Sequence, residues 1–187
     1  MNKLTQYIAF FFLIIVFPSC GNNDAEKNNI DELAIIKKLS QNDFYKDFFP
    51  YNIRPREEEW IYMIETDSIK EFWVEYDKDD GVTFYKDADK KEVEEKLKTI
   101  YPNNYLEIKE TYISDLNNLI PFMVSNGIKA VVHFTSKRID FSLAGGHEII
   151  WLDKSSLNEV VKSFRRFYNI VTVIDSNWVI LKDEKLQ

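Results

Sequence analysis

The sequence predicts an α+β fold: a single domain of antiparallel strand meanders with helices packed against them. Its 187 residues are near the size of one ordinary domain, and 45% of them are hydrophobic, which is enough for a core. Short segments of alternating apolar residues return through turns, as strands in hairpins do. Segments with an apolar residue at every third or fourth position follow these hairpins, as amphipathic helices do.

Two periodicities define the expected elements of the first half. A helix near 30–40 has an apolar stripe, and aromatic residues then crowd the segment 44–51. A continuous apolar run and a clean alternation predict two strands, and an acidic turn ending in glycine predicts a third strand that returns. Asp89 and Glu92 have the spacing of a capping box, and Pro102 would end the helix that they open. The three strands and this helix are expected at 60–64, 70–76, 82–85 and 89–101.

The second half contains the same series after an additional helix. That helix is expected near 115–126, where Pro121 would force a late start or a kink. Ser156 and Glu159 form a second capping box by their spacing. The apolar stripe of the helix that follows is expected at Val160, Phe164, Phe167 and Tyr168. The strands are expected at 130–135, 139–143 and 149–152, with a closing hairpin at 170–174 and 178–181.

The two halves register at a constant offset of 67 residues. Phe72 then falls on Ile139, and Val93 falls on Val160. This register predicts an internal duplication of a strand–strand–strand–helix unit, with half-repeats about 60–101 and 127–168. A chance similarity of two such motifs is the alternative, because few residues are identical.

Residues 1–20 have the features of a targeting segment and are set apart from the fold. Lys3 is the only charge, eleven apolar residues run from Tyr7 to Phe17, and Cys20 follows after a proline and a serine. Eleven residues rise about 16 Å as a helix, roughly half of the hydrocarbon core of a bilayer. The segment is therefore too short to span a membrane.

This segment resembles a bacterial lipoprotein signal, in which a cationic start and an apolar stretch precede a small residue and a cysteine. The resemblance implies cleavage after Ser19, lipid attachment through the sulfur of Cys20 and acylation of the new amino terminus. Several acyl chains hold a protein firmly in a membrane, so the resemblance implies a lipid anchor on the extracytoplasmic side of the cell envelope. An ordinary secretory peptide with a chance cysteine is the alternative.

The organisation expected after cleavage is a flexible tether at 20–29 and a folded domain at 30–187. The tether is small, amide-rich and charged, which is typical of a linker. With Cys20 acylated, the chain would contain no thiol for a nucleophile or a metal ligand, since it has a single cysteine. The domain would then depend on its core alone, without disulfides.

Composition and motifs exclude several functions. With 24 basic and 31 acidic residues the net charge is −7, so no basic surplus exists to follow a nucleic-acid backbone. Neither of the glycine-rich phosphate motifs occurs. His147 and Glu148 begin like a zinc-protease motif, but Trp151 stands where the second histidine is needed. His133 lies inside an expected strand, and two histidines alone provide too few ligands for a convincing metal site. No catalytic residue, metal or cofactor is predicted.

Trp73 is the candidate contact for a partner. It alternates with Phe72 and Val74 and therefore lies on the opposite, glutamate-bearing face of its strand. Tryptophan often serves in binding surfaces, here for a sugar or a protein. In the alternative interpretation, the helix at 30–40 and the aromatic segment at 44–51 cover this side chain.

These features predict a lipid-anchored, non-catalytic binding module of the bacterial envelope, held in the membrane through Cys20. A specific version is an immunity-type protein that neutralises a toxin from a neighbouring cell, because a small acidic domain suits a basic partner. An envelope hydrolase that uses dispersed carboxylates or His133 and His147 is one alternative. An accessory subunit of an envelope complex is another.

Overall fold

The computed structural model describes residues 30–56, 60–85 and 88–182, with the side chains of its second α-helix described from Val93 onward. The strands are β1 (Tyr51–Pro55), β2 (Ile61–Thr66), β3 (Phe72–Asp77), β4 (Gly81–Phe84), β5 (Ile128–Thr135), β6 (Arg138–Leu143), β7 (His147–Leu152), β8 (Ile170–Val173) and β9 (Trp178–Lys182). The α-helices are α1 (Glu32–Ser40), α2 (Ala88–Ile100), α3 (Tyr105–Ser125) and α4 (Leu157–Phe164). Two 3-10 segments are η1 (Gln41–Phe48) and η2 (Ala144–Gly146).

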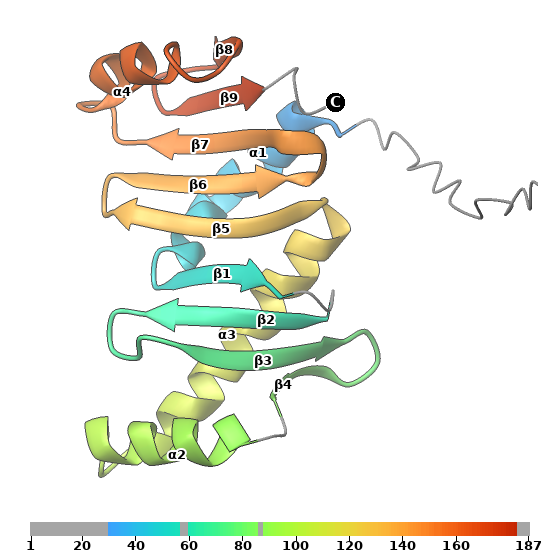
Figure 1. The fold of residues 1–187 in the computed structure, drawn as a ribbon, viewed down its shortest axis with the longest axis vertical. Helices are drawn as coiled ribbons and strands as arrows, with labels where there is room; N and C mark the ends of the chain where they lie inside the picture. The colour runs from blue at the N-terminus through green and yellow to red at the C-terminus, as the bar shows by residue number, and fades with distance from the viewer. Residues whose placement is uncertain (1–29, 57–59, 86–87, 183–187) are drawn as a thin grey trace, which may run out of the picture.

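All nine strands form one antiparallel sheet in the order β4-β3-β2-β1-β5-β6-β7-β9-β8 (Figure 1). Helices cover it within a single α+β domain, which confirms the predicted fold class. The central strand β1 was not expected, because its alternation of Tyr51 and Ile53 with polar residues covers only four positions between Pro50 and Pro55. Pro55 is tolerated because it is the last residue of its strand.

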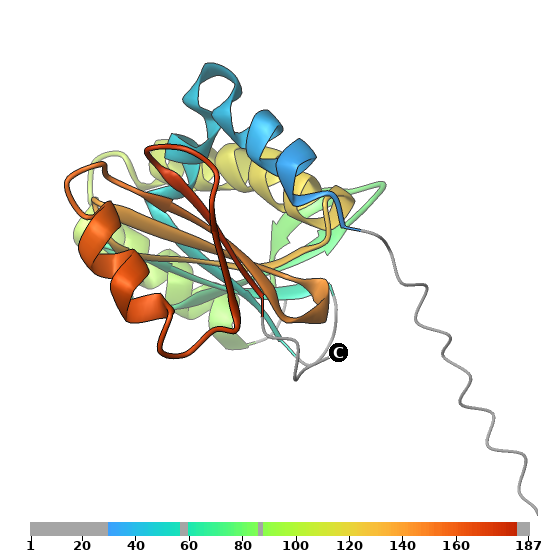
Figure 2. The same ribbon diagram turned by 90° about the horizontal axis from the view of Figure 1, so that it is seen from above.

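Helices lie on both faces of the sheet (Figure 2). On one face, α1, η1, α2 and α3 pack over the main core, to which every strand from β1 to β7 gives at least one buried apolar side chain, such as Phe72 or Phe141. On the other face, α4 covers β7 and β9 through a smaller core. Ile149 belongs to the main core and Ile150 to the smaller one, because successive strand residues point to opposite faces.

The structure corrects three predictions about helices. The helix α3 starts at Tyr105, ten residues earlier than expected, and Pro121 lies inside it. Ser156 is the N-cap of α4, but its backbone is helical (φ −99°, ψ −14°) and its side chain makes no capping hydrogen bond. Phe167 is 74% exposed rather than part of the apolar stripe, because α4 ends at Phe164. The side chain of Asp89, the other expected cap, lies outside the described residues.

The strand–strand–strand–helix order does occur twice at the predicted offset, as β2-β3-β4-α2 and β5-β6-β7-α4. Both β2 and β5 are antiparallel to β1 and flank it, so the two meanders run outward to opposite edges of the sheet. A rotation that superposes them must exchange the two faces of the sheet, yet Phe72 and Ile139 both face the main core. The repeated order is confirmed, whereas an equivalence of the two halves in three dimensions is not.

The predicted signal segment, the lipid-attachment residue Cys20 and the tether lie outside the described residues. Their assignment therefore stays a prediction. Among the helices that the structure describes, none is both long and apolar enough to cross a membrane.

Candidate functional site

One side of the sheet is left open between β4 and β6. We call this surface the open face; it lies opposite α1 and α3, and in the described part of the chain no helix covers it (Figures 1 and 2). The alternation of each strand decides which side chains reach it, since their neighbours in sequence fill the main core. It includes Asn52, Arg54, Met63, Glu65, Trp73, Glu75, Tyr85, Ala130, Asp140 and Ser142.

Trp73 lies in a groove on the open face, with Met63 on one side and Tyr85 on the other. Met63 is its register partner on β2, and the amide of Tyr85 donates a 3.1 Å hydrogen bond to its carbonyl oxygen. The groove has a volume of about 560 Å³. Its lining residues are Arg54, Pro55, Arg56, Ile61, Met63, Trp73 and Tyr85.

Two charged side chains hold the indole of Trp73. Its Nε1 donates a 2.7 Å hydrogen bond to Oε1 of Glu71. On the ring itself, the guanidinium carbon of Arg56 lies 3.0 Å from the ring centre. This cation–π stack orients the indole and places a positive charge at the mouth of the groove. Sequence reasoning missed Arg56, because it follows β1, a strand that was not predicted.

The interpretation in which the aromatic segment covers Trp73 is wrong. That segment forms η1, and its rings pack on the opposite face of the sheet. The ring centre of Phe48 lies 5.4 Å from that of Phe141, and the ring centre of Tyr45 lies 4.9 Å from that of Trp151. Trp73 is therefore partly exposed, and its role as a partner contact stays a prediction.

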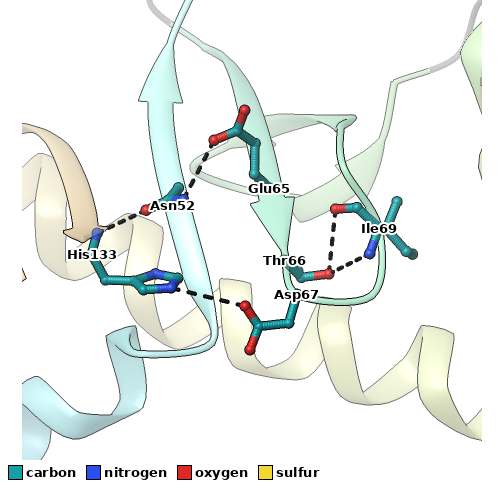
Figure 3. A network of polar contacts seen from close by, with 6 residues as sticks. All are labelled: Asn52, Glu65, Thr66, Asp67, Ile69 and His133. Carbon is teal, nitrogen blue, oxygen red and sulfur yellow. Dashed lines mark hydrogen bonds and ion pairs between the residues drawn. The ribbon is translucent and has the colours of Figure 1, made fainter. Parts of the chain in front are cut away.

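His133 lies in a polar network at one end of the strands (Figure 3). Its amide donates a 2.7 Å hydrogen bond to Oδ1 of Asn52, whose amide nitrogen lies 3.4 Å from Glu65. Its Nε2 lies 4.0 Å from a carboxylate oxygen of Asp67, in the turn between β2 and β3. Its Nδ1 is buried with no hydrogen-bond partner among the described residues. The sequence near His133 contains no sign of Asp67, because only sheet pairing joins the two.

His147 lies in a different environment. Its Nδ1 is 2.7 Å from Oε1 of Glu32, and the ammonium group of Lys182 is 2.6 Å from the same oxygen. Burial raises the pKa of Glu32, but hydrogen bonds from Lys182, from the backbone and from His147 outweigh it and hold that pKa below its ordinary value. Glu32 is therefore a buried carboxylate that stays ionised.

The structure does not bring the two histidines together. His133 on β5 is the register partner of Ile139 on β6, and Ile139 is in turn the register partner of Trp151 on β7. His147 lies four residues from Trp151 along the strand, which is about 13 Å in addition to two strand spacings. In the described residues no group of three or more histidine, cysteine, aspartate and glutamate side chains could hold a metal ion.

Comparison with known proteins identifies no relative of this chain: no protein-family model, no curated protein and no solved structure matches it.

Proposed function

We propose that this protein is a lipid-anchored binding module of the bacterial envelope that contacts a protein partner through the Trp73 groove. The supporting observation is the stack of Arg56 on Trp73, beside Tyr85, on a sheet face that no described helix covers. Tryptophan, tyrosine and arginine are the residues that most often dominate the binding free energy of protein interfaces.

The contacts of Trp73 favour recognition of a preformed surface. Its indole is held from the edge by Glu71 and from the face by Arg56, so little side-chain freedom remains to be lost on binding. Arg54 lies 3.8 Å from Glu65, too far for a strong ion pair, and 43% of its side chain is exposed. A carboxylate of the partner is the natural complement of these two guanidinium groups.

An immunity-type role, in which the module masks a toxin from a neighbouring cell, is the specific version that we favour. Its support is the net charge of −7, which would accelerate the approach of a basic toxin. A lipid anchor at Cys20 would keep the module at the membrane, where an incoming toxin must pass.

The test uses the full chain as bait against envelope and secreted fractions of its own cells, with two variants beside it. We expect Trp73→Ala to weaken capture of a stoichiometric partner about thirtyfold, the effect of losing about 2 kcal/mol at an interface. Trp60→Ala is the matched control, since Trp60 is 52% exposed and does not line the groove. Arg56→Ala, at an exposed position, should also weaken capture without unfolding the domain.

The proposal fails if Trp73→Ala and Trp60→Ala retain the partner equally well. Capture of no protein by the unchanged chain also counts against a protein partner and favours a glycan or small molecule as ligand. Sensitivity of cells to neighbouring strains after deletion of the protein separates the immunity role from assembly of an envelope complex.

A further inference from the structure

A second pocket lies on the same side of the sheet, at the far end from the Trp73 groove. We call it the Glu148 pocket; its volume is about 310 Å³. Four strand-to-strand steps separate Trp73 on β3 from Ser142 on β6, which is about 19 Å. Its lining residues are Ser142, Leu143, Gly146, His147, Glu148, Phe167 and Tyr168.

Three elements build this pocket. Ser142 on β6 and Glu148 on β7 are register partners, so their side chains stand next to each other on one face. The segment after α4 supplies the two aromatic side chains. The hydroxyl of Tyr168 donates a 3.1 Å hydrogen bond to Oε2 of Glu148, while Phe167 stands at the rim with 74% of its surface exposed. Because serine is small, the space above Ser142 stays open.

No ion pair with a lysine or arginine of the described segments balances the charge of Glu148. In the segments that the structure describes, no lysine or arginine lies within 4.0 Å of this carboxylate. Arg138 lies on the same face of β6 as Ser142, and its two hydrogen bonds go to the buried carboxylate of Asp140. Arg165 and Arg166 precede Phe167 but do not line the pocket.

The raised pKa of Tyr168 agrees with a negative electrostatic potential in the Glu148 pocket. Burial is the largest cause that raises the pKa of Tyr168 to about 12, and the charges of Glu148 and Asp140 raise it further against the effect of Arg138. A negative potential, an accepting carboxylate and an exposed ring together favour a positively charged ligand.

We propose that the Glu148 pocket binds an organic cation, an alkylguanidinium or alkylammonium group. The N–H groups of the cation would donate to Glu148 and Ser142, and its flat or methylene surface would pack on Phe167. Such a group occurs on the arginine and lysine side chains of proteins and on free polyamine-like molecules. The inference goes beyond the proposed function, because it assigns a second site that needs no protein partner to be occupied.

The test is a titration of the full chain in detergent micelles, followed by amide NMR. The probes are Nα-acetyl-arginine methylamide, which resembles an arginine within a protein, and agmatine, a free guanidinium compound. We expect saturable shifts at residues 142–148 and 167–168, with a dissociation constant on the order of millimolar for ligands of this size. The corresponding glutamate derivative, an anion, should cause no saturable shift.

Two variants make the result specific. Glu148→Gln keeps an oxygen for the Tyr168 hydroxyl but removes the charge, so we expect at least tenfold weaker binding of both cations. Glu110→Gln, on an exposed position of α3, is the matched control and should bind as the unchanged chain does. Phe167→Ala should weaken binding severalfold with the spectrum of the folded domain unchanged, because this ring is mostly exposed.

The affinities of the two cations distinguish the possible sources of the ligand. Tighter binding of the arginine derivative than of agmatine supports a protein side chain as the source of the cation, and the reverse order supports a free amine. Equal affinity of the unchanged chain and Glu148→Gln, or no saturable shift at all, overturns the proposal. Neither result depends on the capture experiment with Trp73, so the two proposals fail independently.

Discussion

Glu32 and His147 meet through a 2.7 Å contact between Oε1 and Nδ1, although 115 residues separate them in the chain. Glu32 is the first residue of α1, the first described helix after the predicted tether. His147 begins β7, where its register partner Lys182 reaches the same carboxylate. This contact therefore joins the first described helix, next to the predicted tether, to the sheet.

Loss of this carboxylate should destabilise the domain. In Glu32→Gln the buried contact with Lys182 and His147 loses its charge, and we expect the free energy of unfolding to fall by about 2 kcal/mol. Urea unfolding followed by circular dichroism measures this change. The exposed carboxylate of Glu110 provides the control, since Glu110→Gln should change the free energy by less than about 0.5 kcal/mol. Equal stability of both variants would show that the Glu32 contact contributes nothing.

The contribution of Glu32 should disappear in acid. Its pKa is lower in the folded protein than its ordinary value of 4.5, so the unfolded chain binds more protons as the pH falls below about 5. Its stabilising effect is therefore complete at neutral pH and is lost as the pH falls through the folded pKa. The difference in unfolding free energy between the unchanged chain and Glu32→Gln, measured at several pH values, should shrink toward acid. A difference that grows toward acid would contradict this sign.

Gly81 and Gly145 allow a matched comparison of how much stability is lost when a glycine in a turn is replaced by alanine. Both have a positive φ, +76° and +78°. A Cβ at Gly81 would lie 2.6 Å from Oδ1 of Asn117, the atom that accepts a hydrogen bond from the amide of Val82, whereas nothing lies within 4 Å at Gly145. We expect Gly145→Ala to cost about 1 kcal/mol for its backbone and Gly81→Ala to cost about 1–2 kcal/mol more. Thermal and urea unfolding of the two variants measure these losses of stability. Equal losses would show that Asn117 on α3 moves aside from the new Cβ at no cost in stability.

The lipid anchor can be tested at Cys20. Cells that express the unchanged chain should incorporate labelled palmitate into it, and the mature protein should begin at Cys20 by mass spectrometry. Cys20→Ser should abolish the label and release the protein from the membrane fraction, because a weakly apolar tether binds a bilayer poorly without acyl chains. Continued labelling of Cys20→Ser, or a mature chain that begins elsewhere, would exclude a lipoprotein.

Local patterns were sufficient for most of the secondary structure. Continuous apolar runs, alternation and the helical period together predicted every described strand except β1 and the presence of every described α-helix, although α3 starts ten residues earlier than expected. The offset of 67 predicted the repeated order of elements. The alternation of β3 also predicted correctly that Trp73 and Phe72 lie on opposite faces of the sheet. Such patterns succeed because they depend on residues close together in the chain.

The insertion of β1 could not be predicted in this way. Its five residues lie between β2 and β5 and complete the sheet, although an alternation of only four residues between two prolines does not by itself predict a central strand. This insertion brings Asn52 to the amide of His133 and carries Arg56 over Trp73. Both contacts follow from strand order, which is a property of the whole chain.

The sequence alone therefore determined the α+β class, the order of the strands and α-helices other than β1, and the face of Trp73, because local periodicity decides which side of an element is apolar. Only the tertiary structure decided that this face stays open, that Glu148 and Phe167 border one pocket, and that Glu32 meets His147. These relationships join residues far apart in the chain, and their geometry depends on how the strands pair and where the helices pack.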